Sequence, residues 1–401
     1  MRPRVVILSV SYSIETSPIL KALAMDATRR GAAVTFVTDE LGRECSGPVV
    51  PGVAARCLRP GWSRIILGMH ALRRHRPGRL ALRGFRTLDR LVMRLRLKKQ
   101  LQGIQVCFAA EYPGLLLAME AGLRPESTVY LSFEGSDYCT GEWDVAVARR
   151  ALPMCRAVCI ASPERAEGLK AELSLPDMQF VYLPVSWRKV QAAPRFVRKR
   201  DAGEVRLVYS GYLAPWAQLK ELLEAFTIAS RGTAWTLTLH GHSWGTEGYR
   251  DEVLELAADH ANVSFDEAHY EDESYIELLS EFDIGVALYS RIGGGSNWGN
   301  LSLSSGKIAG YCQAGLAIIT NLDDALAQTE PFLHVAEIDG PSLGNAVEAY
   351  LAQPGLYRES SLRLFGTTYD AAPHMERLWA ALGMLEHDPD LVVELDPRGP
   401  G

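Results

Sequence analysis

Short apolar runs alternate with longer amphipathic segments along most of the chain. The run at 4–10, RVVILSV, contains almost no polar residue, which is the pattern of a strand buried on both faces of a parallel sheet. Ser17 and Pro18 indicate a helix start, because serine caps a first turn and proline suits its first position. This strand–helix repetition predicts an α/β fold. In the first half we expect strands at 4–10, 33–40, 104–111, 128–135, 157–162 and 180–185.

The alternation pauses after residue 185 and resumes at residue 205. The segment 191–203 is polar, basic and broken by Pro194, which is typical of a linker. Two successive halves therefore predict two Rossmann-like, doubly wound parallel sheets that face a cleft. We expect the following organisation: an N-terminal domain at 1–190, a linker at 191–203, a C-terminal domain at 204–365, helices at 366–386 that cross back, and a flexible tail at 387–401.

The composition is that of an ordinary globular protein, with 47% hydrophobic and 22% charged residues. No apolar run reaches about 18 residues, so we expect no transmembrane helix. The first residues lack a signal-peptide cleavage site. Seven cysteines, an odd number spread through apolar segments, favour reduced thiols over a disulfide framework. These features predict a cytoplasmic protein.

The segment 64–99 is strongly basic, with 12 Lys and Arg against one acid, although the whole chain has a net charge of −6. Apolar residues recur at helical spacing between the arginines: Phe85, Leu88, Leu91, Val92 and Leu95. A basic amphipathic helix is typical of an element that lies on anionic lipid, here the inner face of the plasma membrane. The alternative is a solvated arginine-rich face packed on the domain. Nucleic acid is less favoured, because no recognition motif accompanies the patch.

The stretch 297–320, NWGNLSLSSGKIAGYCQAGLAIIT, predicts a polar loop, a helix, a glycine turn and a buried strand. The free N–H groups at such a helix start, together with its dipole, suit an anion. The helix contains no acidic residue, so any chemistry here has to proceed without a carboxylate from this element.

The order of elements in the second half resembles the nucleotide-sugar domain of GT-B glycosyltransferases, most closely the family 4 type. The matching segments are LVYSGYL at 207–213, WTLTLHGHSWG at 235–245, VSFDEAHY at 263–270, YIELLSEFDIGVALYS at 275–290 and SSGKIAGYCQAGLAII at 304–319. The resemblance spans roughly Val5 to Leu385. It implies a metal-independent, hexosyltransferase-type enzyme whose first half binds the acceptor. Its co-substrate would be a UDP-, dTDP- or GDP-sugar, with no further cofactor.

The chain departs from the family 4 pattern at four positions. The family usually carries two glutamates in the pattern E-x7-E, and those positions hold Ser302 and Gly310 here. It also usually carries an Arg and a Lys after the first glycine of this domain, and those positions hold Tyr212 and Ala217. The retaining stereochemistry typical of the family is therefore not carried over.

A nucleotide diphosphate leaving group develops negative charge as the glycosidic bond breaks, so its site has to supply positive charge or N–H groups. We expect the donor phosphates at Gly211, Tyr212, Ser304, Ser305, Gly306 and Lys307. Lys307 would replace the missing basic pair; the alternative is an ordinary serine cap followed by a surface lysine. We expect the nucleotide and sugar at His240, His269, Tyr270, Trp298 and Asn300, although each of these has an ordinary structural alternative.

Carboxylates near the ends of first-half strands are candidates for the acceptor side. An inverting transferase needs a base to deprotonate the acceptor hydroxyl. Glu134 is the first candidate and Asp137 the second, with helix capping or an ion pair as alternatives. Glu15 and Glu111 are further acceptor-side candidates. In a retaining enzyme, the leaving phosphate can take the proton instead.

Two other functions remain open. The missing carboxylates and basic pair also suit a non-catalytic GT-B relative that binds a nucleotide or a partner protein. An epimerase of UDP-sugars needs several acids and histidines around the anomeric centre, and 297–320 offers none. For a transferase, the acceptor would be a lipid-linked sugar or polysaccharide precursor if the basic segment lies on a membrane, and a small molecule such as a secondary metabolite if it does not.

Overall fold

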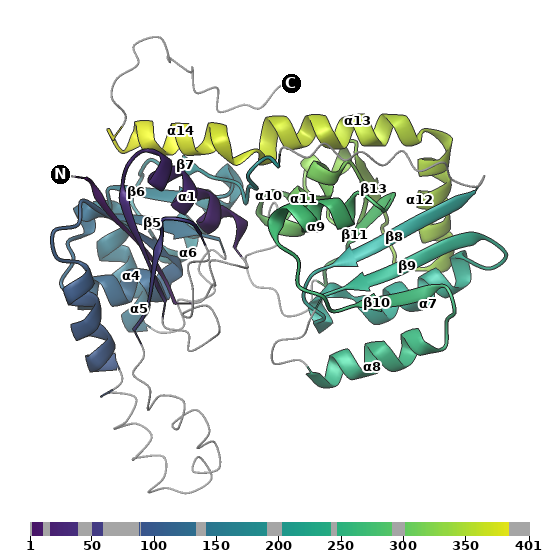
Figure 1. The fold of residues 1–401 in the computed structure, drawn as a ribbon, viewed down its shortest axis with the longest axis horizontal. Coiled ribbons are helices and arrows are strands. Elements are labelled where there is room, and N and C mark those ends of the chain that lie inside the picture. The colour runs from purple at the N-terminus through teal and green to yellow at the C-terminus, as the bar shows by residue number, and fades with distance from the viewer. Residues whose placement is uncertain are drawn as a thin grey trace, which may run out of the picture.

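The computed structural model describes residues 2–10, 17–38, 50–58, 88, 90–133, 142–190, 203–241, 247–290 and 301–384. Two parallel sheets lie side by side, each with helices on both faces (Figure 1). The first sheet has seven strands in the order β3-β2-β1-β4-β5-β6-β7, and the second has six in the order β10-β9-β8-β11-β12-β13. The expected pair of doubly wound sheets is therefore confirmed.

The first sheet is built from short, apolar strands. Its strands are β1 (Arg4–Ser9), β2 (Ala33–Thr38), β3 (Ala54–Cys57), β4 (Val106–Ala110), β5 (Thr128–Ser132), β6 (Ala157–Ile160) and β7 (Val181–Tyr182). The helices around it are α1 (Pro18–Arg29), α4 (Glu111–Glu120), α5 (Glu142–Ala151) and α6 (Pro163–Leu173). Every side chain of β4 and β5 is buried, as expected for strands covered on both faces.

The second sheet repeats the plan. Its strands are β8 (Glu204–Ser210), β9 (Ala234–His240), β10 (Val263–Asp266), β11 (Ile284–Ala287), β12 (Ala317–Thr320) and β13 (Phe332–His334). The associated helices are α7 (Leu219–Ala229), α8 (Glu247–Ala258), α9 (Asp272–Leu279), α10 (Leu301–Ser304), α11 (Gly306–Ala314), α12 (Gly340–Ala352) and α13 (Pro354–Leu364). One core lies under α7, α8 and α12, and another lies on the opposite face under α9 and α11.

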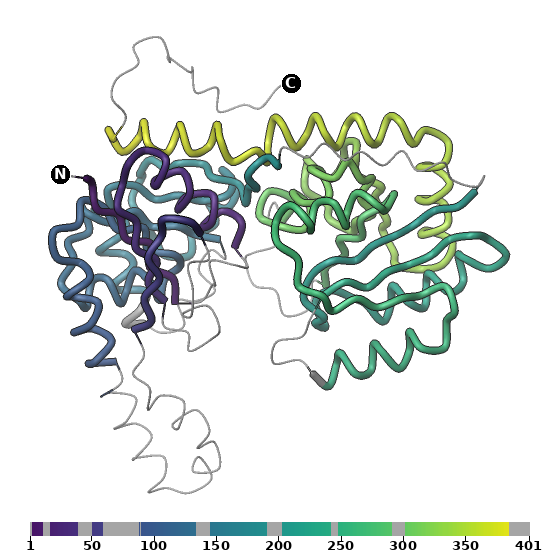
Figure 2. The backbone as a smooth tube through the Cα atoms, viewed as in Figure 1, coloured from purple at the N-terminus to yellow at the C-terminus, as the bar shows by residue number. Residues whose placement is uncertain are grey.

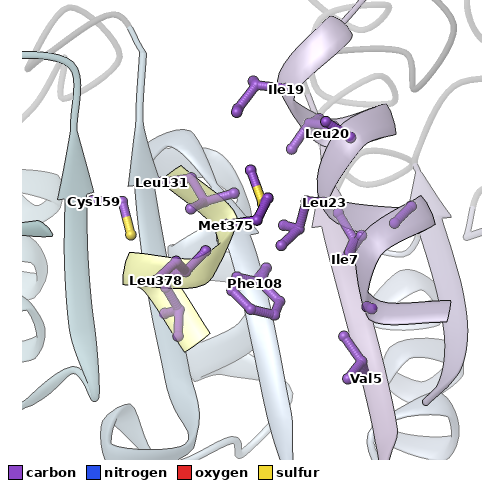
Figure 3. Packing of buried hydrophobic residues seen from close by; sticks show 14 of the residues in the cluster. Val5, Ile7, Ile19, Leu20, Leu23, Phe108, Leu131, Cys159, Met375 and Leu378 are labelled. Carbon is purple, nitrogen blue, oxygen red and sulfur yellow. The ribbon is translucent and has the colours of Figure 1, made fainter. Parts of the chain in front are cut away.

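The last helix, α14 (Ala371–Ala381), packs on the first sheet although it follows the second. Figure 2 shows the chain passing from the first domain to the second and returning at its yellow end. Met375 and Leu378 of α14 lie beside Phe108 of β4 and Leu23 of α1 (Figure 3). Burial of these side chains, each worth about 1.5–3 kcal/mol, holds α14 on the first domain.

Sequence patterns missed two strands, β3 and β13. Both are edge strands of three or four residues, too short to show a clear period. Most of the basic segment and of the linker, and the tail 387–401, lie outside the described residues. Among the described residues, no helix combines the length and the apolar character needed to cross a bilayer.

Candidate active site

The candidate site lies at the carboxyl ends of β8 and β11, where the strand order of the second sheet reverses direction. β8 and β11 are neighbours in the sheet, and the chain winds outward from them on both sides. In open parallel sheets, ligands bind beyond the carboxyl ends of the strands at such a switch point. Gly211 follows β8, Tyr289 follows β11 by two residues, and α11 begins beside them.

Two glycines allow the strand ends to approach each other closely. The N–H of Gly211 donates to the carbonyl of His240 at 3.0 Å, and the N–H of Gly241 donates to the carbonyl of Asp266 at 2.9 Å. A Cβ added to Gly241 would stand 1.9 Å from the carbonyl oxygen of Gly211, and Gly241 has a φ of +148°. Only glycine fits there, because any side chain would collide with backbone. The sequence marks this turn correctly as a glycine loop.

Helix α11 starts with a serine cap. Ser305 is the N-cap residue, and its hydroxyl accepts a hydrogen bond from the N–H of Ile308 at 3.4 Å. The hydroxyl of Tyr289 also lies 2.6 Å from the Ser305 Oγ, which fixes the side chain from the strand side. Ser304 ends α10, and its hydroxyl reaches the carbonyl of Leu301 at 3.4 Å. The side chain of Ser305 therefore caps the helix, which is the ordinary structural role considered for it in the sequence analysis.

Lys307, in the first turn of α11, does not extend into solvent. Its ammonium nitrogen is buried, although part of the residue remains accessible, and it has no hydrogen-bond partner within the described chain. Three aromatic rings surround it, with centroids at 4.3 Å for Tyr209, 5.0 Å for Tyr289 and 5.4 Å for Trp216. The faces of such rings attract a cation. We call these three residues the aromatic cage.

The lysine nitrogen also lies directly over the glycine turn. A Cβ on Gly211 would stand 3.5 Å from the Lys307 Nζ and 3.2 Å from the hydroxyl of Tyr209. Burial without a counter-charge lowers the pKa of Lys307 to about 7. The alternative of a surface lysine is therefore wrong. A desolvated ammonium beside a helix start and a glycine turn is a strong potential partner for a phosphate group.

The aromatic cage was not anticipated from the sequence. Tyr209 lies at the end of β8, Tyr289 lies just after β11, and Trp216 lies in the loop between β8 and α7. Trp216 is 42% exposed, and its ring stacks on that of Tyr289 at 6.3 Å with an interplanar angle of 9°. The cage could have been suggested by one signal: aromatic residues stand at the ends of both buried strands that flank the switch point.

His240 is held inside the protein on both sides of its ring. Its Nε2 lies 3.1 Å from the carbonyl of Ala268, an acceptor, so Nε2 carries the proton in the neutral ring. Its Nδ1 then accepts from the hydroxyl of Ser210 at 2.8 Å, and Ser210 accepts from the hydroxyl of Tyr275 at 2.8 Å. His240 thus serves as a support for the ends of β8 and β9.

The other residues expected at the nucleotide differ in exposure. His269 is exposed, and Tyr270 is half-buried with its hydroxyl donating to Asp266 at 2.9 Å. The ring of Tyr270 lies 5.4 Å from that of His240. Tyr212 is 36% exposed, and its carbonyl accepts from the hydroxyl of Tyr209 at 2.5 Å. Trp298 and Asn300 lie outside the described residues.

The two positions of the missing glutamates have clear structural roles. Ser302 is fully buried, and its hydroxyl donates to Asp324 at 2.7 Å. A Cβ on Gly310 would stand 3.5 Å from a ring carbon of Tyr275 and 3.9 Å from one of Trp187. These rings cover Gly310, so a longer side chain at that position would meet them.

On the acceptor side, the structure places one of the four candidates. Glu111 is fully buried, with a φ of +57°, and its Oε1 accepts from the N–H of Phe133 at 2.5 Å. The guanidinium of Arg165 donates to the carbonyl of the same Phe133. One oxygen of Glu111 therefore fixes the backbone at the end of β5. The other three candidates, Glu15, Glu134 and Asp137, lie outside the described residues.

No side-chain cluster suited to a metal was found in the described part of the chain. Within it, no group of three or more His, Cys, Asp or Glu comes together. The cysteines described there are free thiols, and burial raises the pKa of Cys107 to about 12. Among the described residues, Lys307 and the start of α11 supply positive charge at the candidate site.

Comparison with known proteins agrees with this architecture. No family model and no curated protein sequence matches the chain. HepE from Anabaena, solved in complex with UDP-glucose, matches with a TM-score of 0.69 at 11% identity, over 95% of this chain and 100% of that one. Sucrose-phosphate synthase from Thermosynechococcus elongatus matches with a TM-score of 0.65 at 14% identity, over 94% and 98%. The chain has the GT-B fold.

A third GT-B match is a glycosyltransferase from Rickettsia africae, with a TM-score of 0.65 at 10% identity, over 96% of this chain and 99% of that one. Because these matches cover both domains, the likeness includes the presence of two such sheets in one chain. At such low identity they show the fold alone. The roles of individual residues in this GT-B protein therefore depend on its own geometry.

Proposed function

We propose that the protein is a glycosyltransferase that moves a sugar from a nucleotide diphosphate sugar to an acceptor hydroxyl. The observation that carries this proposal is the buried Lys307 ammonium over Gly211, at the switch point of the second sheet. An unpartnered buried charge destabilises a protein, so its presence at a ligand-binding position favours a role in binding an anion.

The donor diphosphate would lie against Gly211 and the first turn of α11. Lys307 would supply the positive charge, and the free N–H groups and dipole of α11 would add to it. This arrangement needs no metal ion to neutralise the leaving group. Gly306 begins α11, and Ser304 would offer a hydroxyl group, while the hydroxyl of Ser305 caps the helix. HepE was solved with UDP and with UDP-glucose, so these are the first ligands to try.

The nucleotide and sugar would extend from this point along the ends of β9 and β10. Tyr270 and His269 lie there and would contact the base or ribose, while His240 would hold the strand ends in place. Trp298 and Asn300 remain candidates for the sugar because they precede α10 in the chain. Gly310, beside the Tyr275 ring, has no side chain and so makes no glutamate-like contact to the donor.

The base for an inverting reaction would come from the facing domain. Glu134 is our first candidate and Asp137 the second, because both follow the end of β5. The preceding residue, Phe133, is fixed by Glu111 at its N–H and by Arg165 at its carbonyl. Because the backbone of Phe133 is fixed, the carboxylate of the next residue, Glu134, would be placed accurately.

The acceptor would be a lipid-linked sugar or polysaccharide precursor at an anionic membrane surface. Residues 90–100 are helical, and the inner side chain Leu97 is buried. Leu88, Leu91 and Leu95 are 44%, 47% and 61% exposed, with basic side chains around them. An exposed apolar stripe among Lys and Arg complements anionic lipid. Arg90 and Arg94 bond to Glu120 of α4, so these two arginines also hold the helix on the domain.

Calorimetry with UDP, followed by product detection with UDP-glucose, tests the central proposal. We expect the protein to bind UDP and to transfer or slowly hydrolyse the sugar. Lys307→Met should remove binding. Binding without transfer or hydrolysis of any nucleotide sugar would favour a non-catalytic GT-B relative, and absence of binding to UDP, dTDP and GDP would refute the proposal.

Sedimentation with anionic vesicles at low salt tests the acceptor location. We expect the protein to sediment, and Leu91→Asp with Leu95→Asp to remain in solution. Leu356→Asp on α13, where Leu356 is 37% exposed, is the matched control and should still sediment. Failure of the unaltered protein to bind at low salt would contradict a membrane-bound acceptor and favour a small-molecule acceptor.

A further inference from the structure

The chain passes between the domains twice, and the two connecting segments, here called the crossings, meet at Trp187. The first is the segment that follows β7, and the second is the π-helical turn Phe365–Tyr369 between α13 and α14, which run from one domain to the other in Figure 1. The N–H of Trp187 donates to the carbonyl of Tyr369 at 2.9 Å, and the N–H of Ala371 donates to the carbonyl of Trp187 at 3.0 Å. Both crossings are thus hydrogen-bonded to each other at this residue.

The side chain of Trp187 packs at the edge of the second domain's core under α9 and α11, next to the candidate donor site. Its Nε1–H donates to the carbonyl of Gly306 at 2.8 Å, at the first residue of α11. Its ring stacks on Tyr275 of α9, with centroids 5.4 Å apart and an interplanar angle of 17°. One side chain therefore touches both the helix that carries Lys307 and the helix that flanks it.

The contacts continue from Tyr275 to the ends of β8 and β9. The hydroxyl of Tyr275 bonds to Ser210, and Ser210 bonds to His240. These two residues immediately precede Gly211 and Gly241, the glycines of the turn under Lys307. A continuous series of polar and stacking contacts thus connects the interdomain crossings to the proposed diphosphate position.

We propose that Trp187 is a positioning residue that couples the relative orientation of the two domains to donor binding at α11. This inference rests on the proposed function. Because both crossings are bonded to its backbone, a rotation of the domains moves Trp187 and thereby its contacts with Gly306 and Tyr275. Packed contacts of this kind have discrete arrangements rather than a continuous range. Donor binding and the state of the crossings then influence each other reciprocally.

The coupling is tested by hydrogen exchange and calorimetry with UDP. In the unaltered protein we expect UDP to slow amide exchange at α11 and also in both crossings, around Trp187 and Ala371. Trp187→Phe keeps a ring for stacking and removes the indole N–H. It should weaken UDP binding about five-fold, the value of one ordinary hydrogen bond, and should abolish the UDP-linked protection of the crossings.

A matched control is Trp379→Phe in α14, which also loses an indole hydrogen bond, here to Asp26 at 2.7 Å. It should lower the melting temperature while leaving UDP affinity within two-fold and the linked protection intact. If UDP protects α11 but not the crossings, or if Trp187→Phe binds UDP as tightly as the unaltered protein, the coupling is refuted and the proposed function stands. Failure of the unaltered protein to bind any nucleotide diphosphate would refute both.

Discussion

The ammonium nitrogen of Lys307 lies 4.3 Å from the centroid of the Tyr209 ring, and no anion among the described residues neutralises it. Tyr289 and Trp216 complete the cage with further ring faces, so within the described part of the chain only ring quadrupoles stabilise the charge. Each such contact contributes about 0.5–2 kcal/mol, which does not offset full desolvation of an ammonium group. The arrangement is therefore costly to the empty protein, as expected of a binding group before its ligand arrives.

Replacement of Lys307 by methionine should stabilise the protein at neutral pH, by about 1–3 kcal/mol, because it removes the desolvated charge. The folded-state pKa of about 7 lies below the ordinary 10.5, so the unfolded chain binds more protons between these values and stability rises with pH there. From pH 7 to about pH 9, the unaltered protein should gain about 2 kcal/mol relative to Lys307→Met. Urea unfolding of both proteins at the two pH values measures this. Parallel pH curves would contradict a buried, unpaired lysine.

Binding of UDP should be accompanied by proton uptake near pH 8. A diphosphate beside Lys307 favours the charged amine and raises its pKa, so the fraction that was neutral takes up a proton. Calorimetry in buffers of different ionisation enthalpy counts the protons. We expect roughly one proton per UDP at pH 8 and less below pH 6.5, where the amine is already charged. UDP binding without uptake at pH 8 would place the diphosphate away from Lys307.

Much of the fold was predictable from the sequence because both sheets are parallel. Strands buried on both faces read as continuous apolar runs, and Ser-Pro pairs mark helix starts, as at Pro18 and Pro163. The edge strands β3 and β13 carry too few residues for such a signal. The return of α14 to the first domain was expected, but the contacts that hold it, those of Met375 and Leu378 with residues far away in the chain, follow from no local pattern.

The candidate site was predictable only in part. Local sequence preferences predict the glycine turns at Gly211 and Gly241 and the Ser305 cap. They also place Lys307 in the first turn of the helix. The burial of Lys307 does not follow from them, because it depends on three aromatic residues from β8, the following loop and the end of β11. The involvement of Trp187 also escaped prediction, because its partners Gly306 and Tyr275 lie about a hundred residues away.

Replacement of Gly241 by alanine should destabilise the second domain by about 3 kcal/mol or more, since its Cβ would lie 1.9 Å from the Gly211 carbonyl oxygen. The matched control is Gly168→Ala in α6, where a Cβ meets nothing within 4 Å and alanine should stabilise the helix by about 0.5–1 kcal/mol. Chemical unfolding of both variants provides the comparison. A Gly241→Ala protein as stable as the unaltered one would show that these strand ends are not closely packed.

His374 should make the protein sensitive to mild acid. Burial lowers the pKa of its imidazole to about 4, the neighbouring Arg377 adds to this, and the Thr368 carbonyl and Asp370 act in the opposite direction. Because the unfolded chain binds a proton near pH 6.5 and the folded chain does not, the contribution of His374 is complete above that pH and is lost as the pH falls toward 4. Between pH 7 and pH 5 the loss should be about 2 kcal/mol.

His374→Gln removes the titrating group while keeping a donor for the Thr368 carbonyl, which lies 2.7 Å from the Nε2 of His374. The variant should lose about 1 kcal/mol at pH 7, yet show less additional loss at pH 5 than the unaltered protein. Urea unfolding at the two pH values is the measurement. Since α14 packs in the core of the first domain, the effect should appear in the unfolding transition of that domain. An equal loss in both proteins between pH 7 and pH 5 would show that His374 is already solvated when folded.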